Sequence, residues 1–146
     1  VAGLTLGSYT GYLRNPIKNI MFPYHEYVEH WVLAFIYTRE DDKDGEIIPL
    51  SKIDEIVPVI KDIEIIMQEK YKLSADRPGS GNTANIGSSS DIETLRKGTG
   101  VFAKHGEKVF EDYWRNFLQR KIARDMRKVQ PYHNLVEYLA WKKKQK

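Results

Sequence analysis

The apolar side chains of this chain follow two contrasting strand patterns. Trp31–Thr38 is an unbroken run of mostly aromatic and β-branched residues, which is typical of a central strand covered on both faces. From Ile63 to Leu73 apolar and polar residues largely alternate. This period of two predicts a long strand that leads into the following loop, with one wet face and one buried face that carries Ile63, Ile65 and Met67.

Helical periodicity is clearest over Glu107–Lys128, where apolar residues recur at helical spacing. The apolar stripe of this expected helix consists of Val109, Phe110, Tyr113, Trp114 and Phe117. Pro131 ends the helix, Asn134 is placed to cap a last helix, and Ile92–Lys97 predicts a small one. Together with a short strand at Leu4–Leu6, these elements predict an α/β (α+β) fold in a single domain, with a mixed β-sheet flanked by helices.

An acidic turn at Glu40–Glu46 separates the first long strand from a second strand expected at Ile47–Ile48. A short helical turn capped by Ser51 is expected within Leu50–Val59. Asp41-Asp42-Lys43 satisfies the D-x-K half of a nuclease motif only formally, since catalytic carboxylates need a rigid strand. A calcium loop is also excluded, because its last liganding position carries no glutamate. The preferred interpretation is a solvated hairpin turn.

Composition sets limits on the class of protein. The chain has 146 residues, of which 41% are hydrophobic and 12% aromatic, enough for one domain with a core. It has no cysteine, which fits a cytoplasmic protein, and no apolar run long enough to span a membrane. The net charge of +3 hides an asymmetry: residues 39–76 carry eleven acidic and six basic residues, whereas residues 101–146 carry twelve basic and five acidic. A polyanion is expected to bind the basic end.

The segment Gly79–Ser88 is poor in apolar side chains and rich in glycine, hydroxyl and amide groups. Glycines let a backbone approach a partner closely, and asparagine amides can pair with an adenine edge in the major groove. A phosphate cradle would need the spacing G-x-x-x-x-G-K-[ST], which is absent. A flexible surface loop or linker is the simpler alternative.

Several motifs resemble, in the same order, the C-terminal part of the EcoRV-like type II restriction endonucleases, which belong to the PD-(D/E)xK superfamily. The motifs are Thr5–Thr10, Arg14-Asn15, Lys18-Asn19-Ile20, Tyr27 with His30-Trp31, Tyr37-Thr38-Arg39, Gly79–Ser88 and Asp112-Tyr113-Trp114-Arg115-Asn116. The resemblance covers nearly the whole chain. It implies a homodimeric, Mg²⁺-dependent endonuclease that cuts both strands of double-stranded DNA at a short palindromic site in a prokaryotic cell.

The resemblance also implies roles for individual residues. Base recognition is expected from the glycine-loop residues Gly79, Gly81, Asn82 and Thr83, with Ser80 and Asn85 shaping the loop. DNA-backbone contacts are expected from Thr5, Thr10, Lys18, Arg39 and Arg124. Residues next to Arg124 differ from the family pattern.

The family's catalytic acids and the lysine of D-x-K precede the segment that Thr5 begins. We therefore expect no catalytic and no metal-binding residue within residues 1–146, and we expect these groups and most dimerisation elements N-terminal to Val1. A non-catalytic DNA-binding module and a protein-interaction domain are the alternatives. Salt-dependent DNA binding and an upstream D-x-K sequence distinguish them.

Overall fold

The computed structural model describes residues 6, 27–39, 47–56, 58–79, 85–117 and 126–145. The chain separates into two compact units, one formed by Val1–Val32 with Gln68–Lys146 and the other by Leu33–Met67. In the part of the chain that the structure describes, no helix has the length and apolar character needed to cross a membrane.

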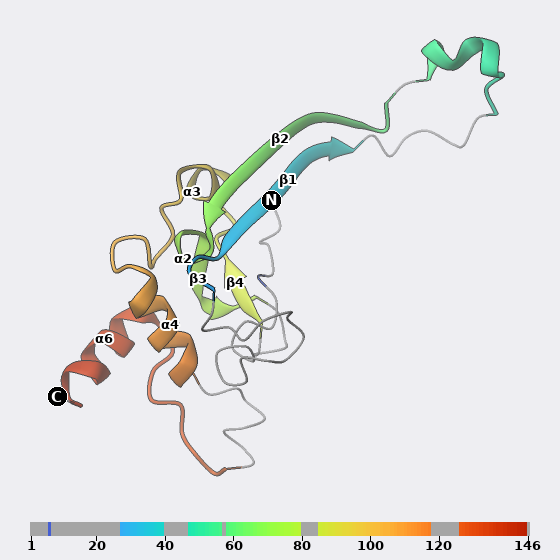
Figure 1. Ribbon diagram of the computed structural model, residues 1–146. Coiled ribbons are helices and arrows are strands. Elements are labelled where there is room, and N and C mark those ends of the chain that lie inside the picture. The colour runs from blue at the N-terminus through green and yellow to red at the C-terminus, as the bar shows by residue number, and fades with distance from the viewer. Residues whose placement is uncertain are drawn as a thin grey trace. The chain divides into compact units, whose positions relative to one another are not determined.

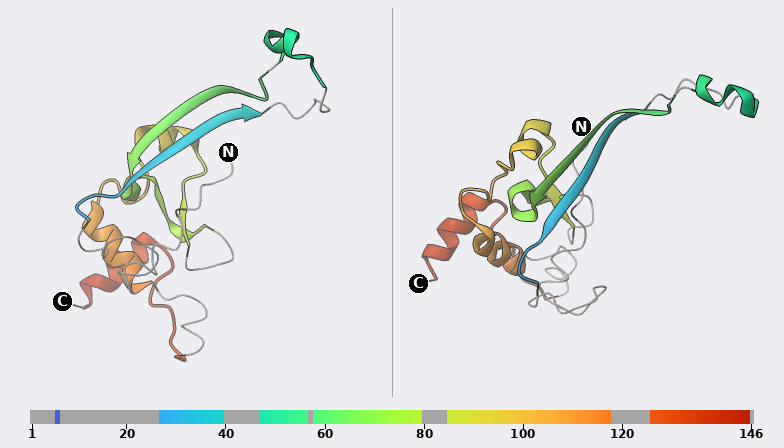
Figure 2. Two further views of the ribbon diagram at one scale, coloured as in Figure 1. Left: turned by 45° about the vertical axis from the view of Figure 1, so that its right-hand side comes forward. Right: turned by 45° about the horizontal axis from the view of Figure 1, so that its top comes forward.

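The smaller unit contains most of an antiparallel hairpin, whose two strands begin and end in the larger unit, and a short helical turn. Strand β1 (Trp31–Arg39) pairs with strand β2 (Ile60–Glu69), and the two lie side by side in every view (Figures 1 and 2). The strand predicted at Trp31 is therefore confirmed. Ile47 and Ile48 form no strand. The helical turn is the 3-10 helix η2 (Leu50–Glu55), which begins after Pro49 without a side-chain cap, so the expectation that Ser51 caps it is wrong.

The burial of this hairpin differs from the expectation. On β1 the apolar side chains at alternating positions are exposed, including Leu33 at 56% and Phe35 at 58%. On β2, Ile63 and Ile65 are likewise exposed, whereas Ile66 is buried. The predictions of a strand covered on both faces and of a buried Ile63 face are wrong for the described structure. Alternation shows which residues share a face, but burial depends on which face another element covers.

In the larger unit, a second hairpin carries the glycine loop. The helical turn α2 (Lys70–Leu73) interrupts the long strand, which the alternating pattern predicts as far as Leu73. Strand β3 (Ser74–Pro78) follows and pairs antiparallel with strand β4 (Ile86–Ser88), so that Ser74 lies opposite Ser88. The glycine loop thus connects β3 and β4 rather than extending from the longer strand β2.

Among the residues that the structure describes, helices α3, α4 and α6 complete this unit (Figure 1). Helix α3 (Ile92–Lys97) begins at Asp91, whose carboxylate accepts a 2.8 Å hydrogen bond from the Thr94 N–H, and ends at Gly98 with a φ of 61°. Helix α6 (Leu135–Lys143) begins at Asn134, whose side chain accepts from the Glu137 N–H at 2.9 Å. The predicted small helix and the predicted Asn134 cap are both confirmed.

Helix α4 (Glu107–Asn116) is shorter than the sequence predicts. Phe117, directly after it, has extended φ and ψ of −67° and 116°, and residues 126–130 are not helical. The Phe117 ring stacks on Tyr113 at 5.8 Å between centroids. The apolar stripe of the described helix therefore ends at the buried Phe117, and Arg127 and Lys128, which the sequence predicts in this helix, are not helical.

The core of the larger unit is mainly aromatic. Its buried residues are Leu6, Ile86, Phe102, Phe110, Tyr113, Trp114, Phe117, Tyr132, Leu135 and Tyr138. Tyr113 lies at its centre, with ring centroids of Tyr132 at 4.9 Å and Trp114 at 5.2 Å. The Leu6 N–H donates a 2.9 Å hydrogen bond to the carbonyl oxygen of Ile86, which attaches Leu6 to β4. Helices packed beside antiparallel strands confirm the mixed α+β class.

Candidate nucleic-acid interface

The base of the glycine loop is closed by two glycines in backbone contact. The Gly79 N–H donates a 3.0 Å hydrogen bond to the carbonyl oxygen of Asn85. A Cβ added to Gly79 would lie 2.9 Å from the Gly87 Cα, and one added to Gly87 would lie 2.7 Å from the Arg77 carbonyl oxygen. Real Cβ atoms do not come this close to backbone, so the β3–β4 base requires glycine at both positions.

The structure describes three of the predicted site residues. Gly79 is exposed, Asn85 is half-buried, and the hydrogen bond between them joins the two ends of the loop. Arg39 is the exposed last residue of β1, in the smaller unit. The other predicted residues lie outside the described residues: Ser80, Gly81, Asn82 and Thr83 in the loop, and Thr5, Thr10, Lys18 and Arg124 among the backbone contacts.

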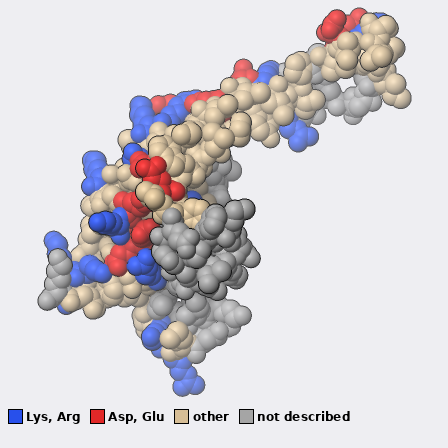
Figure 3. Space-filling view, viewed as in Figure 1, with Lys and Arg blue, Asp and Glu red and all other residues tan. Residues whose placement is uncertain are grey.

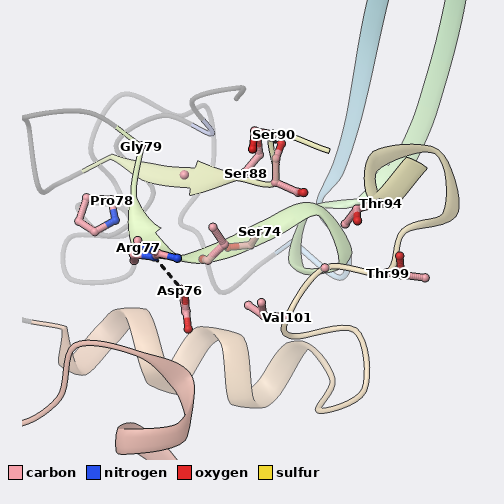
Figure 4. Close-up of a pocket in the computed structure, with 14 residues that line it drawn as sticks. Ser74, Asp76, Arg77, Pro78, Gly79, Ser88, Ser90, Thr94, Thr99 and Val101 are labelled. Atoms are coloured by element: carbon pink, nitrogen blue, oxygen red, sulfur yellow. Dashed lines mark hydrogen bonds and ion pairs between the residues drawn. The ribbon is translucent and has the colours of Figure 1, made fainter. Parts of the chain in front are cut away.

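Asp76 on β3 connects the loop to the helices. Its Oδ2 accepts a 3.0 Å hydrogen bond from the Leu135 N–H in the first turn of α6, and its carbonyl oxygen accepts a 2.6 Å hydrogen bond from the Tyr113 hydroxyl. Burial raises the pKa of Tyr113, so the hydroxyl stays protonated and remains a donor. Figure 4 shows the Asp76 side chain directed toward the helices. The strand leading into the loop is thus held at one residue by two helices.

The same two helices are joined by a charged contact at Asp112. Its Oδ2 accepts hydrogen bonds from the Tyr138 hydroxyl at 2.5 Å and from Lys142 Nζ at 2.7 Å. Burial opposes ionisation of this carboxyl, but the hydrogen bonds from Lys142 and Tyr138 outweigh it and lower the pKa of Asp112. This contact joins α4 to α6 through side chains that do not touch β3.

A polar cavity of about 660 Å³ adjoins the base of the loop (Figure 4). Hydroxyl side chains from β3, β4 and the α3 region surround it: Ser74, Ser88, Ser89, Ser90, Thr94 and Thr99. Arg77 also lines it, with its side chain 84% exposed and its Nε 3.9 Å from Asp76 Oδ1. One side of the loop base is therefore open and suited to hydrogen bonding rather than packed against apolar residues.

Charge on the described surface is mixed. The face of the larger unit in Figure 3 carries acidic side chains between basic ones. In the basic C-terminal part of the sequence, Lys142 pairs with Asp112, and Lys143 lies in the last turn of α6, where positive charge is favourable. The prediction that a polyanion binds the basic end remains a prediction.

A titratable cluster in the larger unit brings together His30, which precedes β1, Lys70 of α2 and Glu107 of α4. His30 Nδ1 lies 3.7 Å from Glu107 Oε1, and the Lys70 N–H donates a 2.8 Å hydrogen bond to the His30 carbonyl oxygen. Burial, and secondarily the charge of Lys70, lower the pKa of His30 to about 4. Burial, together with Glu111, Glu69 and Glu29, raises the pKa of Glu107. This cluster holds a neutral histidine at neutral pH.

Among the residues that the structure describes, no three His, Cys, Asp or Glu side chains are grouped so that they could hold a metal ion. The chemistry that the described residues support is hydrogen bonding and the positioning of a loop.

Three residues that position the site carry no specific signal in the sequence. Gly87 stands out only as part of the glycine-rich segment, and Tyr113 only as part of a helix stripe and of Asp-Tyr-Trp-Arg-Asn. Asp76 precedes the loop as one polar residue among many. A carboxylate three residues before a loop glycine gives no sequence signal, because its partner, the Leu135 N–H, is 59 residues away.

Comparisons with known proteins agree with the motif resemblance. A family model described as restriction endonuclease EcoRV matches residues 1–143. The type II restriction enzyme EcoRV of Escherichia coli is 34% identical to the chain over 140 residues. That alignment covers 94% of the chain and 55% of the enzyme, so the chain spans about half the length of the curated relative that it matches.

Proposed function

The chain belongs to the EcoRV restriction endonuclease family, and from that premise we propose that it supplies DNA recognition to a type II restriction endonuclease. The whole protein cleaves double-stranded DNA at a short palindromic site, and this chain provides base reading in the major groove together with phosphate contacts. The matched relative is itself a type II restriction enzyme. Because the chain aligns with 55% of that relative, cleavage is proposed for the whole protein.

The single observation that carries the proposal is the backbone contact between Gly79 and Gly87 at the base of the loop. It narrows the β3–β4 ribbon and fixes the two points where the loop leaves it. A two-stranded ribbon can enter the major groove, where each base pair presents a distinct pattern of donors and acceptors. A free linker would have no need of two glycines packed against each other.

Within this proposal the predicted residues divide into two groups. Gly79, Ser80, Gly81, Asn82, Thr83 and Asn85 form the base-reading loop. Thr5, Thr10, Lys18, Arg39 and Arg124 contact the DNA backbone. Contacts with phosphates fix the register of a protein on DNA, whereas contacts with base edges carry the sequence information.

The catalytic step is proposed to depend on Mg²⁺ and on acids outside residues 1–146, in a cytoplasmic homodimer. Two copies related by a twofold axis would present one loop each to the two halves of a palindromic site. The described residues would then orient the DNA, and the metal would neutralise charge at the scissile phosphate when bound.

Salt-titrated binding of the purified protein to duplex DNA tests the proposal. A randomised duplex pool is first enriched on the protein to obtain its preferred sequence. The affinity for that duplex should exceed the affinity for scrambled DNA of the same composition. The logarithm of that affinity should also fall linearly with the logarithm of the salt concentration, with a slope of about −0.9 for each neutralised phosphate. Equal, salt-insensitive binding of all duplexes would contradict DNA recognition.

A further inference from the structure

The strand that enters the loop is held at its midpoint by two independent hydrogen bonds. One donor is the Tyr113 hydroxyl in the middle of α4, and the other is the Leu135 N–H at the start of α6. Both end on Asp76, one on its main chain and one on its side chain. Asp76 lies three residues before Gly79, where the loop base is closed. A displacement of Asp76 along β3 would therefore displace Gly79 and the start of the loop, because only two residues separate them.

The contact with α6 is chemically favourable for a carboxylate. The first N–H groups of a helix have no partner within the helix, and the positive end of the helix dipole attracts negative charge. Asn134 satisfies the Glu137 N–H, and Asp76 satisfies the Leu135 N–H. A charged acceptor on a backbone N–H makes a stronger hydrogen bond than a neutral acceptor. The Asp76 side chain is only 18% exposed, so water competes weakly for it.

The contact with Tyr113 joins Asp76 to the least deformable part of the unit. Tyr113 is fully buried, and its own carbonyl oxygen accepts a 2.5 Å hydrogen bond from the Tyr132 hydroxyl. Close-packed aromatic rings surround it at centroid distances from 4.9 to 5.8 Å. Packed cores resist small displacements. The hydrogen bond from the Tyr113 hydroxyl thus holds β3 at a fixed position relative to the core.

We propose that Asp76 is a positioning residue for base recognition: it transmits the fixed geometry of the α4–α6 core to the loop that begins at Gly79. This inference rests on the proposed function. It assigns Asp76 no contact with DNA. Base readout depends on donor and acceptor placement to within a few tenths of an ångström. Loss of the anchor therefore lowers discrimination between similar sites more than it lowers affinity for DNA in general.

The test compares variants of the complete protein for two properties, thermal stability and discrimination. Discrimination is the ratio of affinities for the enriched duplex and for the same duplex with one base pair changed. Asp76→Ala should lower this ratio about tenfold, the scale of one lost base contact, with little change in affinity for scrambled DNA. Asp76→Asn keeps an oxygen acceptor and should restore most of the ratio.

Tyr113→Phe provides a second variant that retains the aromatic ring and removes only the hydroxyl bond to Asp76. It should also lower discrimination. Asp112→Asn is the matched control, because it weakens a charged contact between the same two helices without touching β3. It should lower the melting temperature and leave the ratio unchanged.

A double substitution separates positioning from general stability. Where Asn82→Ala has already removed a base contact, adding Asp76→Ala should reduce discrimination by less than about twofold, since coupled residues give non-additive effects. The inference would be overturned, and the proposed function left intact, if Asp76→Ala and Tyr113→Phe both lowered the melting temperature but discriminated between sites as well as the wild type. A wild-type protein that fails to discriminate would overturn the proposed function as well.

Discussion

Gly79 and Gly87 are in backbone contact across the base of the loop, so that a Cβ on Gly87 would lie 3.0 Å from the Gly79 Cα. The β3–β4 pairing places them there, and the Gly79–Asn85 hydrogen bond closes the ends of the loop beside them. The two ends of the loop can approach this closely because neither Gly79 nor Gly87 has a side chain.

Gly87→Ala is expected to destabilise the protein by about 1–3 kcal/mol, the usual cost of inserting a methyl group into a packed site. Its Cβ would meet the Arg77 carbonyl oxygen and the Gly79 backbone, which are not flexible side-chain ends. Urea denaturation measures the loss. Discrimination between DNA sites should fall as well, because the loop ends must separate.

Gly106→Ala serves as the comparison. Gly106 has a φ of 83°, a Cβ added there would meet no heavy atom within 4 Å, and the residue lies before α4, outside the loop. Alanine there costs about 1 kcal/mol through backbone strain, with no change in site discrimination. If both variants lost stability and discrimination alike, the contact between Gly79 and Gly87 would have no special role in recognition.

Asn82→Ala should weaken binding to the preferred duplex by about 1–3 kcal/mol, the value of one good base contact. An asparagine amide can pair twice with an adenine edge, and alanine cannot. Binding to scrambled duplex should barely change. Titrations of both duplexes at one salt concentration measure the difference, and an equal loss on both would argue against base reading by Asn82.

Lys18→Ala should weaken binding to preferred and scrambled duplexes alike. A lysine that pairs with a phosphate contributes through counterion release, which is independent of sequence. The slope of the logarithm of affinity against the logarithm of salt concentration should become shallower by about one. An unchanged slope would mean that Lys18 makes no phosphate contact.

Local chemistry explains which parts of the fold could be predicted. The Asn134 cap and the small helix over Ile92–Lys97 depend on residues close to each helix end, and both predictions agree with the structure. The end of α4 could not be predicted, because it depends on the packing of Phe117 against Tyr113 and Tyr132 in the core. Helical spacing along the sequence does not show where tertiary packing ends a helix.

The candidate site divides in the same way. The composition of the loop indicates hydrogen bonding, and the family motifs indicate DNA. The anchor at Asp76 depends on two partners that lie 37 and 59 residues away in sequence. No pattern along the chain reveals such a pairing. The exposed apolar side chains on β1 and β2 show the same limit, because a sequence pattern reveals which residues alternate but not which layer covers them.

The low pKa of His30 predicts a pH dependence of stability. Its pKa is about 4 in the folded protein and 6.5 in an unfolded chain. Between these values the unfolded state binds more protons, so the free energy of unfolding falls as the pH is lowered from about 6.5 to about 4. Glu107 acts in the opposite direction, since its raised pKa contributes stability that is lost as the pH increases through its folded value.

The variant His30→Gln isolates the contribution of His30 to the pH dependence of stability, because glutamine does not titrate and Glu107 and Lys70 stay in place. Urea denaturation of both proteins at several pH values between about 4 and about 7.5 measures the free energy of unfolding. The wild type should lose more stability than His30→Gln as the pH falls through this window, and the two curves should run parallel above about pH 7. The difference will be smaller than the full pKa shift implies, since the cluster is partly open to solvent and charges there are screened. Parallel curves over the whole range would mean that His30 has the same pKa in the folded and unfolded states. Burial would then not lower the pKa of His30 in the folded protein.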